Sequence, residues 1–126
     1  MTSYVVDPAD RVAGEITVPG DKSVSHRAVM FGALAEGRTH VTGFLEGEDC
    51  LSTMKAVAHL GVRVEQPGPG EVIVEGVGLH GLREPTVPLD MGNAGTAMRL
   101  FMGLLSAQPF DSELIGDASL MRRPME

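Results

Sequence analysis

The sequence contains few of the residues that mark several large classes of protein. Cys50 is the only cysteine, which excludes an intrachain disulfide and a metal site built on paired cysteines. Aromatic residues make up 4% of the chain and its formal net charge is −7, so neither base stacking nor a basic face supports a general nucleic-acid binder. No apolar run is long enough to cross a bilayer, and residues 1–4 lack the basic and apolar regions of a secretory signal. We therefore expect a cytoplasmic protein with no nucleic-acid or membrane partner.

What the sequence does contain is an alternation of strand and helix patterns. Its 126 residues, 43% of them hydrophobic, are enough for one globular domain with a sizeable core. Short β-branched runs predict strands, apolar residues three and four positions apart predict helices, and glycines mark the helix ends. The order predicted for the first part of the chain is strand 14–18, helix 22–35, strand 39–42, helix 51–60, and strands 62–65 and 72–75 joined as a hairpin.

The opening pattern returns later in the chain, which indicates an internal repeat. Arg27 and Arg99 lie 72 positions apart, and the same offset aligns Asp21 with Asn93. Around Arg99 the predicted elements come in the order of the first unit, namely strand 87–90, turn 92–93, helix 94–106 and strand 112–115.

This repeat predicts one complete unit and one unfinished unit. We expect an α/β (α+β) fold built from β-α-β-α-β-β units, the first over about 14–76 and the second over about 86–126. The next helix of the second unit would begin near Leu120 and be cut off at the end of the chain. Apolar faces that await the absent elements would be exposed or covered by another copy, so we expect self-association.

The residues that could carry chemistry lie at predicted helix starts. Lys22, Ser23 and Arg27 bring an ammonium, a hydroxyl and a guanidinium fork to the start of helix 22–35, beside N–H groups that have no intrahelical partner. A phosphate or a carboxylate fits such a place. Taken as structure alone, the same residues form a capped helix with solvated charges.

Two further clusters repeat this arrangement. The segment 92–99 is rich in small residues, which let the backbone at a helix start approach an anion, although a plain helix N-terminus is about as good an interpretation. The segment 122–124 adds an arginine pair near a turn, which alone would be an ordinary surface pair. Together the three clusters predict one cleft that holds two anionic groups or two anionic substrates side by side.

The remaining polar residues give weaker signals. Asp49, with Glu46 and Glu48, could form an acidic site, but a solvated loop is the better interpretation. No two histidines have the spacing of a metal site. We therefore predict no metal ion, and we assign no catalytic role to any of the four histidines, which are His26, His40, His59 and His80.

Three segments, 20–28, 92–99 and 122–125, resemble the signatures of the 5-enolpyruvylshikimate-3-phosphate synthase family, in the order and spacing of that family. The resemblance runs from about Val12 to the last residue. The UDP-N-acetylglucosamine enolpyruvyl transferases share the architecture, but they have Lys-Asn where this chain has Lys22-Ser23 and they lack the arginine that follows. They are the second candidate family. A binding or assembly module that keeps the fold without the chemistry is the alternative from another class.

The resemblance implies an inverse-barrel fold of two lobes, each made of three repeats, of which this chain would hold about one and a half. It also implies a reaction, in which the enolpyruvyl group of phosphoenolpyruvate is transferred to the 5-hydroxyl of shikimate 3-phosphate and phosphate is released. No cofactor is implied. Because the family's second lobe supplies the acid and base carboxylates, the resemblance implies that this chain alone does not turn over.

Site roles follow from the same resemblance. It implies that Lys22, Ser23 and Arg27 hold shikimate 3-phosphate, and that Lys22 lies between both substrates as the catalytic residue. Phosphoenolpyruvate would be held by Lys22 together with Asn93, Gly95, Thr96 and Arg123.

Overall fold

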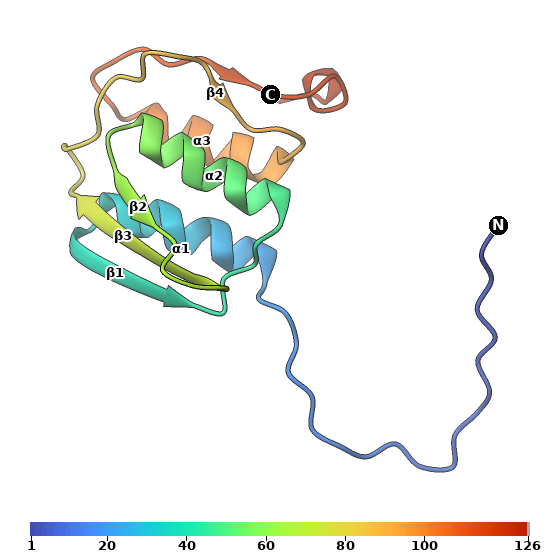
Figure 1. Cartoon of the computed structure of the whole chain (residues 1–126). Coiled ribbons are helices and arrows are strands. Elements are labelled where there is room, and N and C mark those ends of the chain that lie inside the picture. Colours follow the sequence, from blue (N-terminus) through green and yellow to red (C-terminus); the bar gives the residue numbers. More distant parts are fainter. Residues whose placement is uncertain (126) are drawn as a thin grey trace.

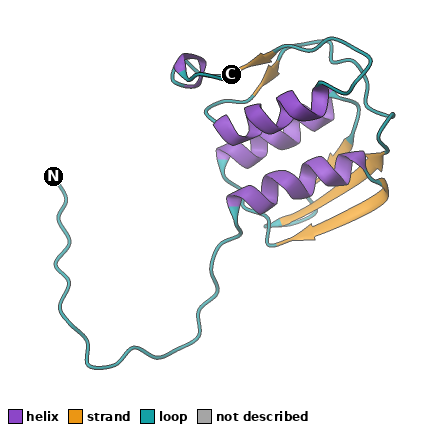
Figure 2. Cartoon of the chain, turned by 180° about the vertical axis from the view of Figure 1, so that it is seen from behind, coloured by secondary structure: helices purple, strands orange, loops and turns teal. Residues whose placement is uncertain are grey.

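Helices and strands alternate along most of the chain, as predicted (Figures 1 and 2). The computed structural model describes residues 1–125. Among them, no helix combines the length and the apolar character needed to span a membrane. The elements, in chain order, are α1 (Lys22–Leu34), β1 (Glu36–Thr42), α2 (Glu48–His59), β2 (Arg63–Glu65), β3 (Glu71–Val77), β4 (Leu89–Asp90), α3 (Gly95–Leu105), β5 (Leu114–Ile115) and the 3-10 turn η1 (Leu120–Arg122).

A three-stranded antiparallel sheet forms one side of the body, with the strand order β1-β3-β2. Buried and partly buried side chains alternate along the central strand, β3. Val72 and Val74 are fully buried, whereas Ile73 between them is only partly buried. Helices α1 and α2 lie on the same side of this sheet (Figure 1). The predicted hairpin between β2 and β3 is confirmed.

The second half of the fold is a short β-α-β unit. Strands β4 and β5 pair in parallel, with Leu89 opposite Leu114, and α3 is the helix of the crossover between them. Phe101 of α3 is fully buried, as are Leu89 and Leu120. These side chains belong to the same hydrophobic core as the buried residues of α1, α2 and β3, so the two halves share one core.

All three helices begin on the same side of the body (Figure 1). The side chain of Asp21 caps the first of them, because its Oδ1 atom accepts a hydrogen bond from the N–H of Val24 at 2.7 Å. The starts of α2 and α3, after Gly47 and Ala94, have no such side-chain cap. The fold therefore brings three sets of helix-start N–H groups to one side of the molecule.

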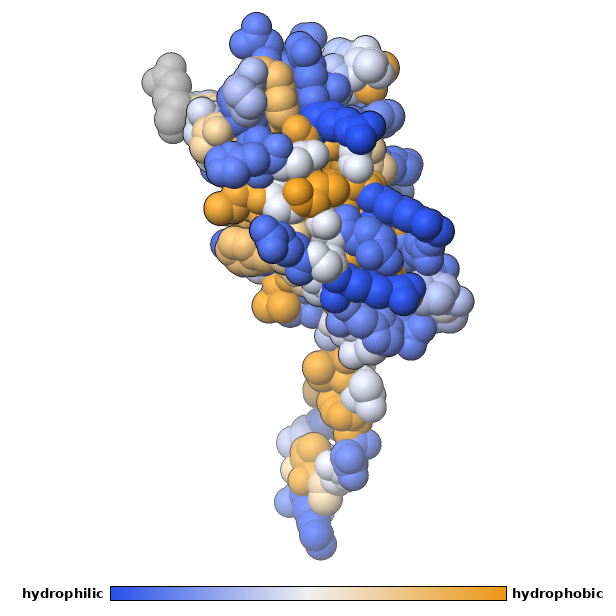
Figure 3. Space-filling view, turned by 90° about the vertical axis from the view of Figure 1, so that its left-hand side faces the viewer, coloured by the Kyte–Doolittle hydropathy of each residue, from blue (hydrophilic) through white to orange (hydrophobic). Residues whose placement is uncertain are grey.

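Two sequence-based predictions about the elements are wrong. The segment 14–18 is not a strand, because no neighbouring backbone pairs with it among the described residues and its Ile16 and Val18 side chains are exposed. It lies in the N-terminal tail, which projects from the body (Figures 1 and 3). The first part of the chain therefore reads α-β-α-β-β, without the predicted opening strand. The helix expected from Leu120 is only the 3-10 turn η1, because Arg123 before Pro124 is extended, as the residue before a proline tends to be.

Candidate functional site

The start of α1 gathers the first cluster. Gly20 makes this possible, because a Cβ atom there would lie 1.9 Å from the carbonyl oxygen of Gly43, against which the turn is seated. Within the helix, the Nη1 atom of Arg27 donates to the backbone carbonyl oxygen of Ser23 at 3.1 Å. Lys22, Ser23 and Arg27 are all exposed. Their polar groups are therefore open to a solute at this end of the helix.

One of the N–H donors expected at this helix start is already used. The N–H of Val24 is occupied by the Asp21 carboxylate, whereas those of Lys22 and Ser23 have no hydrogen-bond partner among the described residues. Two backbone donors therefore remain for an anion, beside the ammonium and the guanidinium.

Lys22 forms an ion pair that the sequence did not reveal. Its Nζ atom contacts Oδ2 of Asp49, in the first turn of α2. The prediction that Asp49 lies in a solvated loop is wrong, because α2 begins at Glu48, three residues before the expected start. The Asp49 side chain is 22% exposed and the Lys22 side chain 52% exposed, so the pair lies at the edge of the body with the ammonium on the outside.

The start of α3 holds the second cluster, which is built mainly from side chains. The turn before it is formed by Gly92, whose φ of 56° lies in the left-handed region that favours glycine. The next residue, Asn93, accepts a hydrogen bond at Oδ1 from Nη2 of Arg123 at 2.9 Å. Its Nδ2 atom donates to Oδ2 and Oδ1 of Asp117, at 2.9 and 3.0 Å. Arg123 is therefore held directly over the start of α3.

Gly95 is the point on which two guanidinium groups converge. A Cβ atom there would lie 3.1 Å from Nη1 of Arg123 and 3.3 Å from Nη1 of Arg99. Arg99 is fixed in turn, because its Nη2 atom donates to the carbonyl oxygen of Pro124 at 2.9 Å. Thr96, next to Gly95, is exposed. The sequence predicted that a ligand would approach the backbone of this glycine. The structure adds that the guanidinium groups of Arg99 and Arg123 lie beside it.

Asp117 is the residue of this cluster that sequence reasoning missed. Hydrogen bonds from the N–H of Leu120 and from the side chain of Asn93 lower the pKa of its carboxyl group below the ordinary value. The available signal was the Gly-Asp pair directly after a predicted strand, which is typical of a turn whose carboxylate binds nearby N–H groups. Asp117 is exposed and accepts hydrogen bonds from the Asn93 amide.

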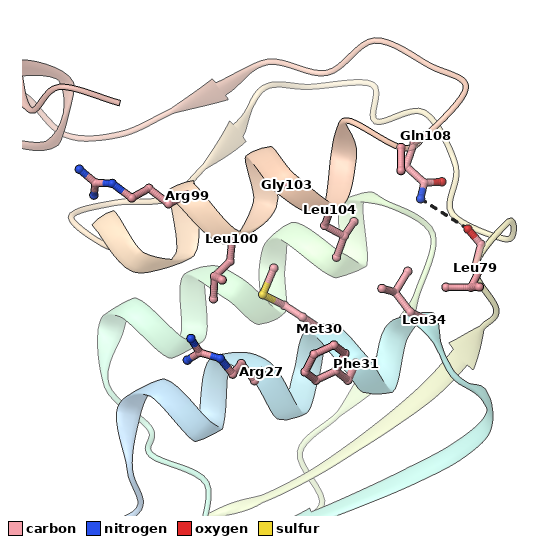
Figure 4. A pocket seen from close by; sticks show the side chains of 11 residues that line it. Arg27, Met30, Phe31, Leu34, Leu79, Arg99, Leu100, Gly103, Leu104 and Gln108 are labelled. Atoms are coloured by element: carbon pink, nitrogen blue, oxygen red, sulfur yellow. Dashed lines mark hydrogen bonds between the residues drawn. The ribbon is translucent and has the colours of Figure 1, made fainter. Parts of the chain in front are cut away.

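One arginine from each cluster lines the same groove. Arg27 of α1 and Arg99 of α3 stand at the same end of a groove of about 430 Å³, lined between the helices by apolar side chains including Met30, Leu100 and Leu104 (Figure 4). The structure therefore brings the two arginines that the repeat aligned to one surface. Within residues 1–125, no group of three His, Cys, Asp or Glu residues could hold a metal ion.

Comparison with known proteins decides the family. Residues 6–126 match the family model of EPSP synthase (3-phosphoshikimate 1-carboxyvinyltransferase). The chain belongs to the EPSP synthase family. This confirms the family predicted first from the three sequence segments.

Curated EPSP synthases are similar along nearly the whole chain. The 3-phosphoshikimate 1-carboxyvinyltransferase of Methylococcus capsulatus is 58% identical over 122 residues, which is 97% of this chain and 28% of that protein. The one from Acidithiobacillus ferrooxidans is 59% identical over 125 residues, or 99% of this chain and 29% of that protein. The chain therefore spans less than a third of the length of these relatives.

A solved EPSP synthase has the same fold over this region. The enzyme from Acinetobacter baumannii is 64% identical, with a TM-score of 0.85, over 89% of this chain and 26% of that chain. The predicted α/β class is thus confirmed.

Proposed function

We propose that this chain supplies the phosphate- and carboxylate-binding helix starts of an EPSP synthase, which transfers the enolpyruvyl group of phosphoenolpyruvate to shikimate 3-phosphate and releases phosphate. The names of its curated relatives support this reaction. The observation that carries the proposal is the placement of Arg27 and Arg99, from two helix starts, at the same end of one groove.

In this proposal each cluster has its own substrate. Lys22, Ser23 and Arg27 bind the phosphate and nearby hydroxyls of shikimate 3-phosphate, because they offer an ammonium, a hydroxyl and a planar fork around free N–H groups. All three side chains are exposed at that helix start, so a solute can reach them.

Phosphoenolpyruvate is assigned to the second helix start. Gly95 leaves room at the backbone, Arg123 provides charge, and Asn93 fixes that charge in place. Thr96 lies beside them as an exposed hydroxyl, and Lys22 reaches toward both substrates in the proposal.

The chemistry follows from fixed positive charge. Addition of the 5-hydroxyl across the double bond of phosphoenolpyruvate, with a proton added to the methylene carbon, gives a tetrahedral intermediate that carries two phosphate groups and two carboxylates. Elimination then removes a proton from the new methyl group and breaks the C–O bond to the phosphate that came from phosphoenolpyruvate. Cations that are already oriented stabilise this polyanion without reorganising, and side-by-side binding supplies the proximity. Lys22 is the one ammonium in the cluster and is assigned the catalytic role.

The chain alone is expected to bind and not to turn over. It spans less than a third of its relatives' length, and in the proposed scheme the acid and base carboxylates come from the part that it does not contain. The division into a first unit over about 14–76 and a second over about 86–126 stays a prediction, as do cytoplasmic localisation and the absence of nucleic-acid and membrane partners.

Isothermal titration of residues 1–126 with shikimate 3-phosphate tests the proposal. Arg27→Ala should weaken binding by about 10- to 100-fold, because a hydrogen-bonded charge pair is removed. Arg38→Ala is the matched control, since Arg38 lies on β1 and pairs with Glu75. Equal losses in both variants would contradict a site at α1, and measurable phosphate release with both substrates would contradict the expected inactivity.

We also propose that the isolated chain self-associates through the groove between α1 and α3. Phe31 at its edge is 69% exposed and Leu79 is 65% exposed. Because the groove and the projecting Phe31 ring lie on the same face, a two-fold arrangement would place each ring against the groove of the other copy.

A further inference from the structure

Directly beside the first cluster, the imidazole of His26 is fully buried. It extends from α1 toward α2, where its Nδ1 atom lies 2.7 Å from Oγ1 of Thr53, a hydroxyl that is also fully buried. Histidine and threonine are seldom buried without a polar partner, and here they are partners of each other. The contact joins the interiors of two helices that both begin at the candidate site.

The hydrogen bonds around Thr53 allow the ring hydrogen of His26 to be assigned. The Thr53 hydroxyl is placed to donate to the carbonyl oxygen of Asp49, at 3.4 Å. With its single hydrogen used there, the oxygen accepts from His26, so we assign the ring hydrogen to Nδ1. The other nitrogen, Nε2, is buried and has no hydrogen-bond partner among the described residues. A neutral ring leaves Nε2 as a bare acceptor, whereas a protonated ring would bury an N–H group without an acceptor.

Asp49 connects this buried contact to Lys22. Its backbone carbonyl oxygen accepts a hydrogen bond from the Thr53 hydroxyl, and its carboxylate forms the ion pair with the Lys22 ammonium. Helices α1 and α2 are therefore joined twice within one turn of each, by His26 and Thr53 inside and by Lys22 and Asp49 at the surface. The inner contact fixes the turn of α2 from which the Asp49 carboxylate extends.

We propose that neutral His26, acting through Thr53, is a positioning residue that holds the first turn of α2 so that Asp49 keeps Lys22 in place, and that protonation of His26 releases Lys22. What Lys22 does once it is in place rests on the proposed function. The positioning itself does not, because it concerns only contacts within this chain.

The electrostatics around the ring agree with this geometry. Burial lowers the pKa of His26; Asp49 of α2 opposes this shift, and Lys22 and Arg27 of its own helix add to it. A lowered pKa in the folded state means that the unfolded chain takes up the proton first as the pH falls. The stability due to neutral His26 is therefore complete above the ordinary value of 6.5 and is lost as the pH falls through the folded-state pKa.

The test uses the fact that Lys22 and Lys55 are the only lysines in the chain. Brief labelling of residues 1–126 with acetic anhydride, read by mass spectrometry, gives the reactivity of Lys22 relative to Lys55. Lys55 is exposed on α2 and serves as the internal reference. Because both amines experience the same pH, their ratio cancels the intrinsic effect of pH on lysine reactivity.

Three variants separate the steps of the proposal. Thr53→Val removes the hydroxyl and should raise the ratio about two- to fivefold at pH 7.5, the effect of losing a partly exposed ion pair. Thr53→Ser keeps the hydroxyl and should match the wild type. In the wild type the ratio should rise by a similar factor as the pH falls below the ordinary imidazole value of 6.5. It should stay constant in His26→Asn, whose amide can still donate to Thr53 and does not titrate in this range.

Val74→Ala is the control for general loss of stability, because Val74 is fully buried and belongs to β3 rather than to either of the two helices joined by this contact. It should lower the urea midpoint and leave the ratio unchanged. An unchanged ratio in Thr53→Val, a wild-type ratio that stays constant at every acid pH at which the chain remains folded, or an equal acid response in His26→Asn would each overturn the proposal. If the labelling pattern is as expected but the chain does not bind shikimate 3-phosphate, only the proposed function is contradicted.

Discussion

The Nη2 atom of Arg123 donates to Oδ1 of Asn93 at 2.9 Å, across 30 positions of the chain. This bond ties the segment after η1 to the start of α3. The second cluster therefore depends on side chains from two distant segments, whereas the residues of the first cluster all come from α1. The predictions for the two clusters differ accordingly.

Arg123→Ala should weaken binding of phosphoenolpyruvate by about 10- to 100-fold, because it removes a charged donor held over Gly95. Arg122→Ala is the matched control, since Arg122 is exposed one position earlier and carries the same charge. Titration calorimetry at constant ionic strength compares the two. If both variants lost the same affinity, net charge rather than the position of Arg123 would account for binding.

Acidification should release the Asn93 side chain. The pKa of Asp117 is lowered by the Leu120 N–H and the Asn93 amide, so its contribution to stability is present above the ordinary carboxyl pKa and is lost as the pH falls through the lower, folded-state value. The Asn93 side-chain amide signals in a nitrogen-edited NMR spectrum should move as the pH falls below the ordinary carboxyl value of 3.8. In Asp117→Asn, the same signals should show no such titration step.

Gly95→Ala should leave the fold intact and weaken phosphoenolpyruvate binding. The added methyl group would meet the ends of two flexible side chains, Arg123 and Arg99, which can move away. We expect the free energy of unfolding, measured by urea denaturation, to change by less than about 1 kcal/mol. A large loss of stability would show that the arginines cannot shift, and unchanged affinity would show that their position over Gly95 does not matter for binding.

Leu120→Ala should destabilise the chain by about 2–5 kcal/mol, the usual cost of deleting a buried leucine. Leu120 is fully buried and anchors η1, which carries Arg123 to the second cluster. Met121→Ala is the control, because Met121 is 57% exposed. Chemical unfolding followed by circular dichroism measures both. Equal effects would contradict the anchoring role of Leu120.

Phe31→Lys should shift the isolated chain toward the monomer in sedimentation velocity, because it places a charge at the edge of the groove. Val24→Lys is a control on the same helix, since Val24 is 65% exposed and does not line the groove. A wild-type chain that stays monomeric at high concentration would contradict self-association.

The helices could be predicted because their signals are local. Helical spacing and flanking glycines placed α1 and α3 to within a residue or two of each end. The segment 14–18 has a strand pattern as well, but a strand needs a second backbone, and the sequence does not show whether one is present. Local pattern alone therefore misassigned it.

The site was predicted only in part, for a related reason. Lys22, Ser23, Arg27 and Gly95 belong to continuous motifs, so the sequence alone marked them. The contacts of Lys22 with Asp49 and of Asn93 with Asp117 join residues far apart in the chain. They depend on how α2 and β5 are placed in the fold. No spacing rule brings them together. These polar partners emerge only once the packing is known.

The shared direction of α1, α2 and α3 makes this acidic molecule an electric dipole. The helix starts carry partial positive charge. Lys22 and Arg27 lie within the first two turns of α1, Arg99 lies near the start of α3, and Arg123 lies over that start. A small anion repelled by the net charge at long range is attracted once it nears that end. Added salt would screen both forces, so the association rate of such an anion reports which of the two dominates.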